Sequence, residues 1–202
     1  MSGTIELMNS RLSGSEIALS QLAWAKIAER KAPRMLIGGL GMGFTLRAAL
    51  ADLPKDAQIT VAELVPQVIA WAKGPLAHLY NGCLGDKRLI LRQADVADLL
   101  ADASLPYDAI LMDTDNGPDG LNRDANDSLY SVSGLARMRK AVKHGGVLAV
   151  CRPDPISRSP AACAAQASPW KKSKSAPAPP ARARGISSGL ASRGKQTATF
   201  AR

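Results

Sequence analysis

The sequence predicts an α/β protein whose doubly wound, mostly parallel sheet carries helices on both faces. Between residues 35 and 151, short apolar runs alternate five times with amphipathic stretches. This alternation is typical of βα units. The runs are apolar throughout and not at every second residue, as expected for parallel strands buried on both faces. Aromatic residues make up only 4% of the chain, so the core must consist of Ala, Leu, Val and Ile.

The expected strands are short, and chemistry-bearing residues follow several of them directly. The first runs into a glycine-rich turn, the second ends at Glu63, and the fourth ends at Asp113. Because ligands of such sheets bind at the carboxyl ends of the strands, these residues are candidates for a site. The strands are expected at residues 35–37, 59–62, 88–92, 107–112 and 147–151.

The expected helices begin and end at recognisable signals. Pro33 closes the first helix and Pro54 ends the second, while Gly74-Pro75 must bend or break the third. His144-Gly145-Gly146 is predicted to stop the last helix before the final strand. The helices are expected at residues 14–31, 43–53, 66–79, 96–101 and 131–142.

Composition divides the chain into a helical lead-in, residues 1–34, an α/β nucleotide-binding domain, residues 35–151, and a basic tail, residues 152–202. The tail holds ten Lys and Arg against one acid, Asp154, and so accounts for the whole net charge of +9. The preceding residues are neutral, so we expect nucleic acid to bind only through the tail, if at all.

Of the 51 tail residues, 37 are Ala, Ser, Pro, Lys or Arg. Such a segment buries too little apolar surface to offset its ordering entropy, so we expect it to be disordered. The expected sheet then ends with its fifth strand, and the further C-terminal strands that the family resemblance given below implies are apparently missing. Natural disorder, a truncated relative and a shifted reading frame near residue 156 are three explanations. We favour the third, because a GC-rich gene read out of frame yields Ala, Arg, Pro and Gly; sequencing the gene decides it.

Cysteine usage and hydropathy indicate a cytoplasmic protein. The three cysteines, Cys83, Cys151 and Cys163, show no C-x-x-C spacing, so neither a disulfide framework nor a metal site is expected. The first 20 residues lack the basic start and apolar run of a signal peptide. Nowhere do about 18 apolar residues follow one another, so no membrane span is expected.

A glycine-rich loop joins the first strand to the second helix. Gly39, Gly41 and Gly43 allow a tight turn beside the free N–H groups of a helix N-terminus. A dinucleotide fingerprint would need glycine at Phe44, which disfavours NAD. Glu63 follows 20 residues after Gly43, where a carboxylate can accept both hydroxyls of a ribose. The alternative for the glycine loop is a tight turn that binds no ligand. The alternative for Glu63 is a solvated residue at the end of a strand.

Three further carboxylates follow the third and fourth strands. Asp95 can accept a hydrogen bond from an adenine amino group, cap the helix at 96–101, or do both. Asp113 and Asp115 lie one residue apart, and such a pair suits a cationic amine, with one carboxylate as a base. A turn built from Asp, Asn, Gly and Pro is the alternative.

Together these segments resemble the class I S-adenosylmethionine-dependent methyltransferase superfamily, and within it the spermidine synthase-like proteins. The resemblance covers about residues 9–151. It rests on the order and spacing of five segments, MLIGGLGMG, ITVAELVPQVIAWA, RLILRQADVADLL, YDAILMDTDNGP and LYSVSGLARMRKAVKHGGVLAV. The resemblance implies a Rossmann-like fold and a transferase of polyamine biosynthesis that moves an aminopropyl group from decarboxylated S-adenosylmethionine to an amine acceptor.

The resemblance also implies roles for the site residues. The three glycines would line the amino-acid or aminopropyl end of the donor, Glu63 would hold the ribose, and Asp95 the adenine. Asp113 matches the acid that deprotonates the attacking amine, and Asp115 roughly matches a second acid that holds it.

Spermidine synthases also carry an Asp in the glycine loop, where Leu40 or Gly41 stands here, and an N-terminal strand domain that this chain does not match. Methyl transfer from S-adenosylmethionine to a small molecule and an inactive nucleotide-binding module therefore remain alternatives. The resemblance also allows a homodimer.

Overall fold

The computed structural model describes residues 14–102, 106–113 and 129–150. The basic tail, 152–202, lies outside the described residues, as do the first 13 residues of the lead-in and the segment that follows Asp113. None of the helices within the described ranges is long and apolar enough to cross a membrane.

Five parallel strands form one sheet, in the order β3-β2-β1-β4-β5. The chain runs outward from β1 in one direction and then returns to build β4 and β5 on the other side. The predicted doubly wound parallel sheet is therefore confirmed. The strands are β1, Arg34–Gly38; β2, Gln58–Glu63; β3, Leu89–Gln93; β4, Tyr107–Met112; and β5, Val142–Val150.

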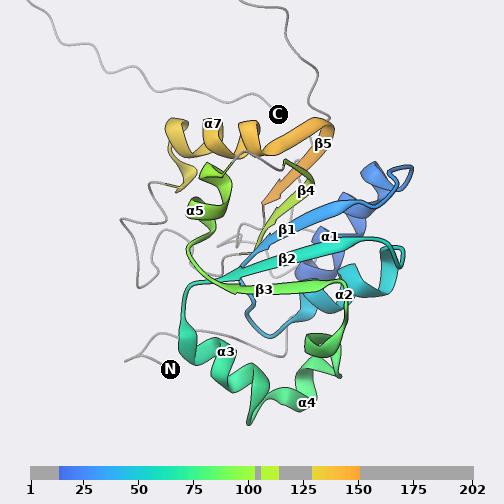
Figure 1. Cartoon of the computed structure of the whole chain (residues 1–202), viewed down its shortest axis with the longest axis vertical. Helices are drawn as coiled ribbons and strands as arrows, with labels where there is room; N and C mark the ends of the chain where they lie inside the picture. The colour runs from blue at the N-terminus through green and yellow to red at the C-terminus, as the bar shows by residue number, and fades with distance from the viewer. Residues whose placement is uncertain (1–13, 103–105, 114–128, 151–202) are drawn as a thin grey trace, which may run out of the picture. The chain divides into compact units, whose positions relative to one another are not determined.

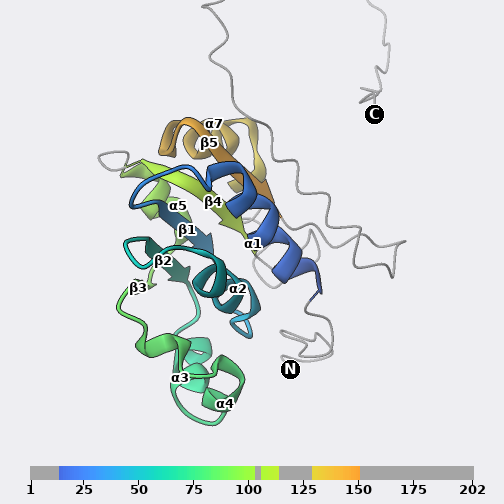
Figure 2. The ribbon, with the colours of Figure 1, turned by 90° about the vertical axis from the view of Figure 1, so that its right-hand side faces the viewer.

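Helices cover both faces of this sheet (Figure 1), and α1 and α2 lie in front of the strands in Figure 2. Alternate residues of each strand supply the two layers of core. On β1, Met35 and Ile37 pack with α1 and α2, whereas Leu36 packs with α5 and α7. The helices are α1, Gly14–Ile27; α2, Phe44–Asp52; α3, Pro66–Lys73; α4, Ala77–Tyr80; a 3-10 turn, Cys83–Gly85; α5, Val96–Ala101; and α7, Val132–Ala141.

Gly74-Pro75 breaks the predicted helix at 66–79 into α3 and α4, as expected. Gly74 adopts φ −118° and ψ −112°, outside the helical region. The helix at 14–31 is shorter than predicted, because the chain leaves it at Ile27 and Ala32 adopts a positive φ of 44°. That residue sits in the turn that redirects the chain into β1.

The prediction that His144-Gly145-Gly146 stops a helix was wrong. The helix ends at Ala141, and β5 begins at once with Val142, five residues earlier than predicted. Val142 pairs with Tyr107, but the next pair joins Ala109 to Val147, so β5 carries a bulge. Gly145 has a φ of +72°, and a Cβ on Gly146 would lie 2.6 Å from the Asp108 carbonyl oxygen. The glycines therefore serve a bulge pressed against β4.

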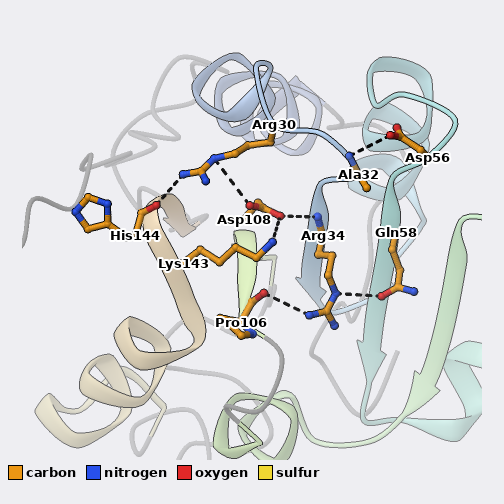
Figure 3. Close-up of polar contacts among 9 residues, drawn as sticks. All are labelled: Arg30, Ala32, Arg34, Asp56, Gln58, Pro106, Asp108, Lys143 and His144. Atoms are coloured by element: carbon orange, nitrogen blue, oxygen red, sulfur yellow. Dashed lines mark hydrogen bonds and ion pairs between the residues drawn. The ribbon is translucent and has the colours of Figure 1, made fainter.

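A buried carboxylate, Asp108, joins the amino ends of β1, β4 and β5 (Figure 3). Its side chain is 2% exposed and accepts hydrogen bonds of 2.8 Å from the Arg34 backbone N–H and from Lys143 Nζ. Arg30 Nε lies 3.9 Å away, and its Nη2 donates to the His144 carbonyl oxygen at 2.7 Å. The segment after α1 is thereby tied to the bulge of β5.

The Arg34 side chain extends this network across the sheet edge (Figure 3). Its Nε donates to Gln58 Oε1 at 3.2 Å, and its Nη1 donates to the Pro106 carbonyl oxygen at 3.3 Å. The guanidinium also lies 5.1 Å from the centre of the Tyr107 ring. Residues of β1, β2 and β4 are thus joined by one side chain at the edge opposite the strands' carboxyl ends.

Arg88 fastens the start of β3 to the end of α2. Its guanidinium donates to the carbonyl oxygens of Leu50 and Leu53 at 2.8 and 2.7 Å. Leu50 lies in the last turn of α2 and Leu53 is its C-cap residue, so no intrahelical donor reaches either carbonyl. Asp86 holds the guanidinium from the other side at 2.8 Å. The hydrogen bonds from Arg88 lower the pKa of Asp86 to about 2.

We predict that Asp108→Asn destabilises the protein by about 1–3 kcal/mol, because it removes the charge that Lys143 and Arg30 face and leaves a poorer acceptor. Urea unfolding measures the change as a lower midpoint with an unchanged slope. Asp52→Asn, at an exposed carboxylate that ends α2, is the control and should shift stability by less than about 0.5 kcal/mol. Equal effects of both substitutions would contradict a special role of Asp108.

We also predict that Asp86 makes stability depend on pH in the acid range. A lowered folded pKa means that the stabilisation is complete above the unfolded value of about 3.9 and is lost as pH falls toward about 2. The wild type should therefore exceed Asp86→Asn by about 1 kcal/mol at neutral pH, a modest value for a partly exposed pair. The difference in stability between wild type and Asp86→Asn should vanish as the pH falls toward about 2. Urea titrations at a series of pH values test this, and a constant difference would contradict it.

Candidate functional site

The carboxyl ends of the strands bring the predicted residues to one edge of the sheet. Gly38 ends β1 and leads into the glycine loop, and Glu63 ends β2 beside it. Asp113 follows β4, the other neighbour of β1, and Asp95 lies two residues beyond the end of β3. Since the winding direction of the sheet changes between β1 and β4, a ligand crevice is expected at this place.

The glycine loop is held by backbone hydrogen bonds to the end of β2. The Gly39 N–H donates to the Ala62 carbonyl oxygen at 2.8 Å, and the Leu40 N–H donates to Glu63 Oε2 at 2.9 Å. The three predicted glycines all have positive φ, of 98° at Gly39, 48° at Gly41 and 76° at Gly43. This conformation is one that L side chains rarely adopt, so the loop depends on its glycines.

Tyr80 supports the loop from the segment after α3, and the sequence analysis did not foresee it. It is 1% exposed, and its hydroxyl donates to the Gly41 carbonyl oxygen. Its ring lies so close to Gly43 that a Cβ there would meet Cδ1 at 2.5 Å. Burial, with Cys83 and Glu63 nearby, raises the pKa of Tyr80 to about 12. The phenol therefore stays protonated and keeps its donor.

Glu63 is buried, with 7% of its surface exposed, and both of its carboxylate oxygens are occupied by the backbone. Besides the bond from Leu40, Oε1 accepts the Val65 N–H at 2.8 Å. Each oxygen can accept about two hydrogen bonds, so this fixed carboxylate retains capacity for a ligand hydroxyl. Glu63 is thus more than the solvated strand-end residue that was the alternative.

Asp95 caps α5, as one of its two predicted roles requires. Its side chain accepts the Ala97 N–H at 2.8 Å, and the helix starts at Val96. The cap fixes the carboxylate beside the end of β3. A capping oxygen has further lone pairs, so the cap is compatible with a bond to a ligand.

Asp113 is held by both its backbone and its side chain. Its N–H donates to the Gly38 carbonyl oxygen at 3.0 Å. This bond continues the β1–β4 pairing to Asp113, the last described residue before the gap at 114–128. Its Oδ2 accepts the hydroxyl of Thr45, a residue of α2 that the sequence analysis also missed. Asp115, the predicted partner acid, lies outside the described residues. Its role stays a prediction.

The arrangement places three fixed carboxylates, those of Glu63, Asp95 and Asp113, at the edge of the sheet that carries the glycine loop. The sequence analysis did not use the one local feature of Thr45, a polar residue between two apolar ones in Phe44-Thr45-Leu46, and this feature does not indicate its partner. Tyr80 had no comparable signal, because only the fold brings it to the loop. Among the described residues, no group of three or more His, Cys, Asp or Glu side chains is placed to hold a metal ion.

Comparison with solved structures gives the same fold. The chain is similar to a spermidine synthase from Thermotoga maritima, with 23% identity over 70% of this chain and 45% of that one, and a TM-score of 0.53. It is also similar to a spermidine synthase in complex with the transition-state analogue AdoDATO, with 22% identity, 70% and 44% coverage, and a TM-score of 0.52. The chain thus spans under half the length of these proteins.

No protein-family model matches the sequence, and no curated protein matches it either. The likeness therefore establishes a spermidine synthase-like Rossmann fold, and the activity has to be argued from the site.

We predict that Gly43→Ala damages the loop far more than Gly82→Ala. Both glycines have nearly the same positive φ, 76° and 75°, so both substitutions cost about 1 kcal/mol or more in backbone strain. Only at Gly43 does the new Cβ also strike the Tyr80 ring, whereas at Gly82 nothing lies within 4 Å. Urea unfolding should show a clearly larger loss for Gly43→Ala, and equal losses would contradict the contact with Tyr80.

Proposed function

We propose that the chain is a transferase that binds decarboxylated S-adenosylmethionine, or S-adenosylmethionine itself, and transfers an aminopropyl group to an amine acceptor. The observation that carries this proposal is the position of Glu63. Its carboxylate is fixed by the Leu40 and Val65 N–H groups directly beside the glycine loop. A carboxylate at the end of the second strand of such a fold is suited to the two hydroxyls of a ribose.

The other residues fit the remaining parts of such a donor. Asp95, held as the cap of α5, is suited to accept a hydrogen bond from the adenine amino group. The positive-φ glycines keep side chains away from the loop, so the sulfonium tail can approach its backbone. The spermidine synthase with bound AdoDATO is similar to this chain in fold, which supports a donor of this chemical class.

Asp113 is placed for the chemistry of transfer. In the proposed step the nitrogen of a neutral amine attacks the aminopropyl carbon that is bonded to the sulfonium sulfur. The bond between this carbon and sulfur breaks, and its electrons move to sulfur. Asp113, as general base, accepts the proton that the amine loses, and so provides the neutral nitrogen that attacks. The sulfonium supplies the leaving group, so the protein has mainly to align the two reactants and take up one proton.

Methyl transfer is a second candidate, and one observation favours it. The loop from Gly38 to Gly43 holds no carboxylate, although the free amine of an aminopropyl tail is a cation that would gain from one. A donor whose tail carries its own carboxylate needs less compensation there. The two donors differ by this single group, so their relative affinities distinguish the two reactions.

Calorimetric titration with the two donors is the test, followed by turnover with diamines. We expect the decarboxylated donor to bind more tightly, and Glu63→Gln to weaken either donor at least about tenfold, because the amide has one acceptor oxygen for two backbone N–H groups and the ribose. Asp113→Asn should bind the donor nearly as well as wild type but lose about 100-fold or more in turnover.

Each outcome has a distinct meaning. Tighter binding of S-adenosylmethionine would replace aminopropyl transfer by methyl transfer. Donor binding without turnover on any amine would indicate an inactive binding module. A wild-type protein that binds neither donor would overturn the proposal. Asp98→Asn, at an exposed residue of α5, is the control and should leave affinity and turnover unchanged.

A further inference from the structure

We propose that Thr45 is a positioning residue for Asp113, and that its hydroxyl holds the carboxylate in its ionised form and in one orientation. The inference rests on the proposed function for its consequence in catalysis, since Asp113 is the base there. The contact itself is independent of any ligand. Thr45 Oγ1 donates to Asp113 Oδ2 across the boundary between α2 and the end of β4.

The position of Thr45 explains why a hydroxyl is present. Thr45 is the second residue of α2 and is 2% exposed, between the partly buried Phe44 and the buried Leu46. Valine has nearly the same shape and would fill this place without a polar atom. A buried hydroxyl is costly unless it finds a partner, and here the partner is the carboxylate.

The same hydrogen bond completes the fixation of Asp113. The backbone N–H is already bound to the Gly38 carbonyl oxygen at 3.0 Å, so β1 sets the main chain while α2 sets the side chain. A donor to an ionised carboxylate favours the charged form. The base is thereby kept ready to accept a proton, with its plane fixed relative to the glycine loop.

Three charged side chains on the elements around Asp113 have partners elsewhere. On β1 the Arg34 guanidinium donates to Gln58 Oε1 and to the Pro106 carbonyl oxygen. On β5 Lys143 binds Asp108, and on α2 Arg47 donates to the Leu79 carbonyl oxygen. Glu63, at the end of β2, adds negative charge near the site. The described titratable and charged groups on α1, β1, α2, β4 and β5 are Glu16, Lys26, Arg34, Arg47, Asp52, Tyr107, Asp108, Lys143 and His144.

The test compares Thr45→Val, which lacks the hydroxyl, with Thr45→Ser, which retains it. The titration of the Asp113 carboxyl carbon is followed by NMR in the free protein. We expect the midpoint in Thr45→Val to be higher by about 0.5–1 pH unit, and that in Thr45→Ser to match wild type. Thr60→Val, at another buried threonine on β2, is the control and should leave the midpoint unchanged.

Thr45→Ala is a second variant without the hydroxyl, should the valine not be tolerated. Equal midpoints in the serine variant and in a folded non-donating variant would overturn the proposal. Turnover adds the functional consequence. Thr45→Val should lower kcat about 3- to 10-fold with little change in donor KM, and Thr45→Ser should restore it.

The two proposals fail separately. If the wild type neither binds a donor nor transfers a group, the proposed function is lost, yet the NMR titration still decides whether Thr45 governs Asp113. If donor transfer is found but the midpoints do not respond to the hydroxyl, the proposed function stands and the role of Thr45 is refuted.

Discussion

The fixed carboxylate of Glu63 is the constraint on which the site depends. It joins the glycine loop, through Leu40, to the end of β2 and to the turn into α3 that follows it, through Val65. A buried charge is tolerated only where hydrogen bonds replace water, and two backbone donors do so here. The glycine loop therefore has one shape, and the residues around it, Tyr80 included, are arranged about a rigid acceptor.

The sheet separates this site from the interactions that stabilise its other end. Asp108, Arg34 and Lys143 act at the amino ends of the strands, whereas Glu63 and Asp113 lie at the carboxyl ends. Parallel pairing makes this possible, because every strand of such a sheet points its carboxyl end to the same edge. The end that holds the sheet together and the end suited to ligand chemistry are thus built from different residues.

The fold could be predicted from local patterns in the sequence. Continuous apolar runs predicted all five strands, and Gly74-Pro75 marked the helix break, because burial and proline geometry leave a direct trace in sequence. The bulge of β5 did not, since Gly145-Gly146 stops a helix or lines a bulge equally well, and only the packing against Asp108 decides.

Glu63, Asp95 and the glycines were predicted as site residues from their places after strands, and the structure places them at the carboxyl ends of the strands, while their roles toward a ligand stay predictions. The supporting contacts of Tyr80 and Thr45 join residues 39 and 68 positions apart in the chain, so no local pattern reveals them. Asp115 and the basic tail stay predictions.

The support of the glycine loop by Tyr80 has a consequence for how the protein could be altered. The loop is shaped partly by a residue from the irregular segment after α3, which includes the short helix α4 and the turn at Gly82. Connecting segments tolerate changes in length and sequence better than strands do. A change in this segment would move the Tyr80 ring, and with it the part of the glycine loop that Tyr80 contacts, at Gly41 and Gly43. For the proposed transferase, directed evolution of donor preference could therefore begin in this segment, which contains none of the site carboxylates Glu63, Asp95 and Asp113.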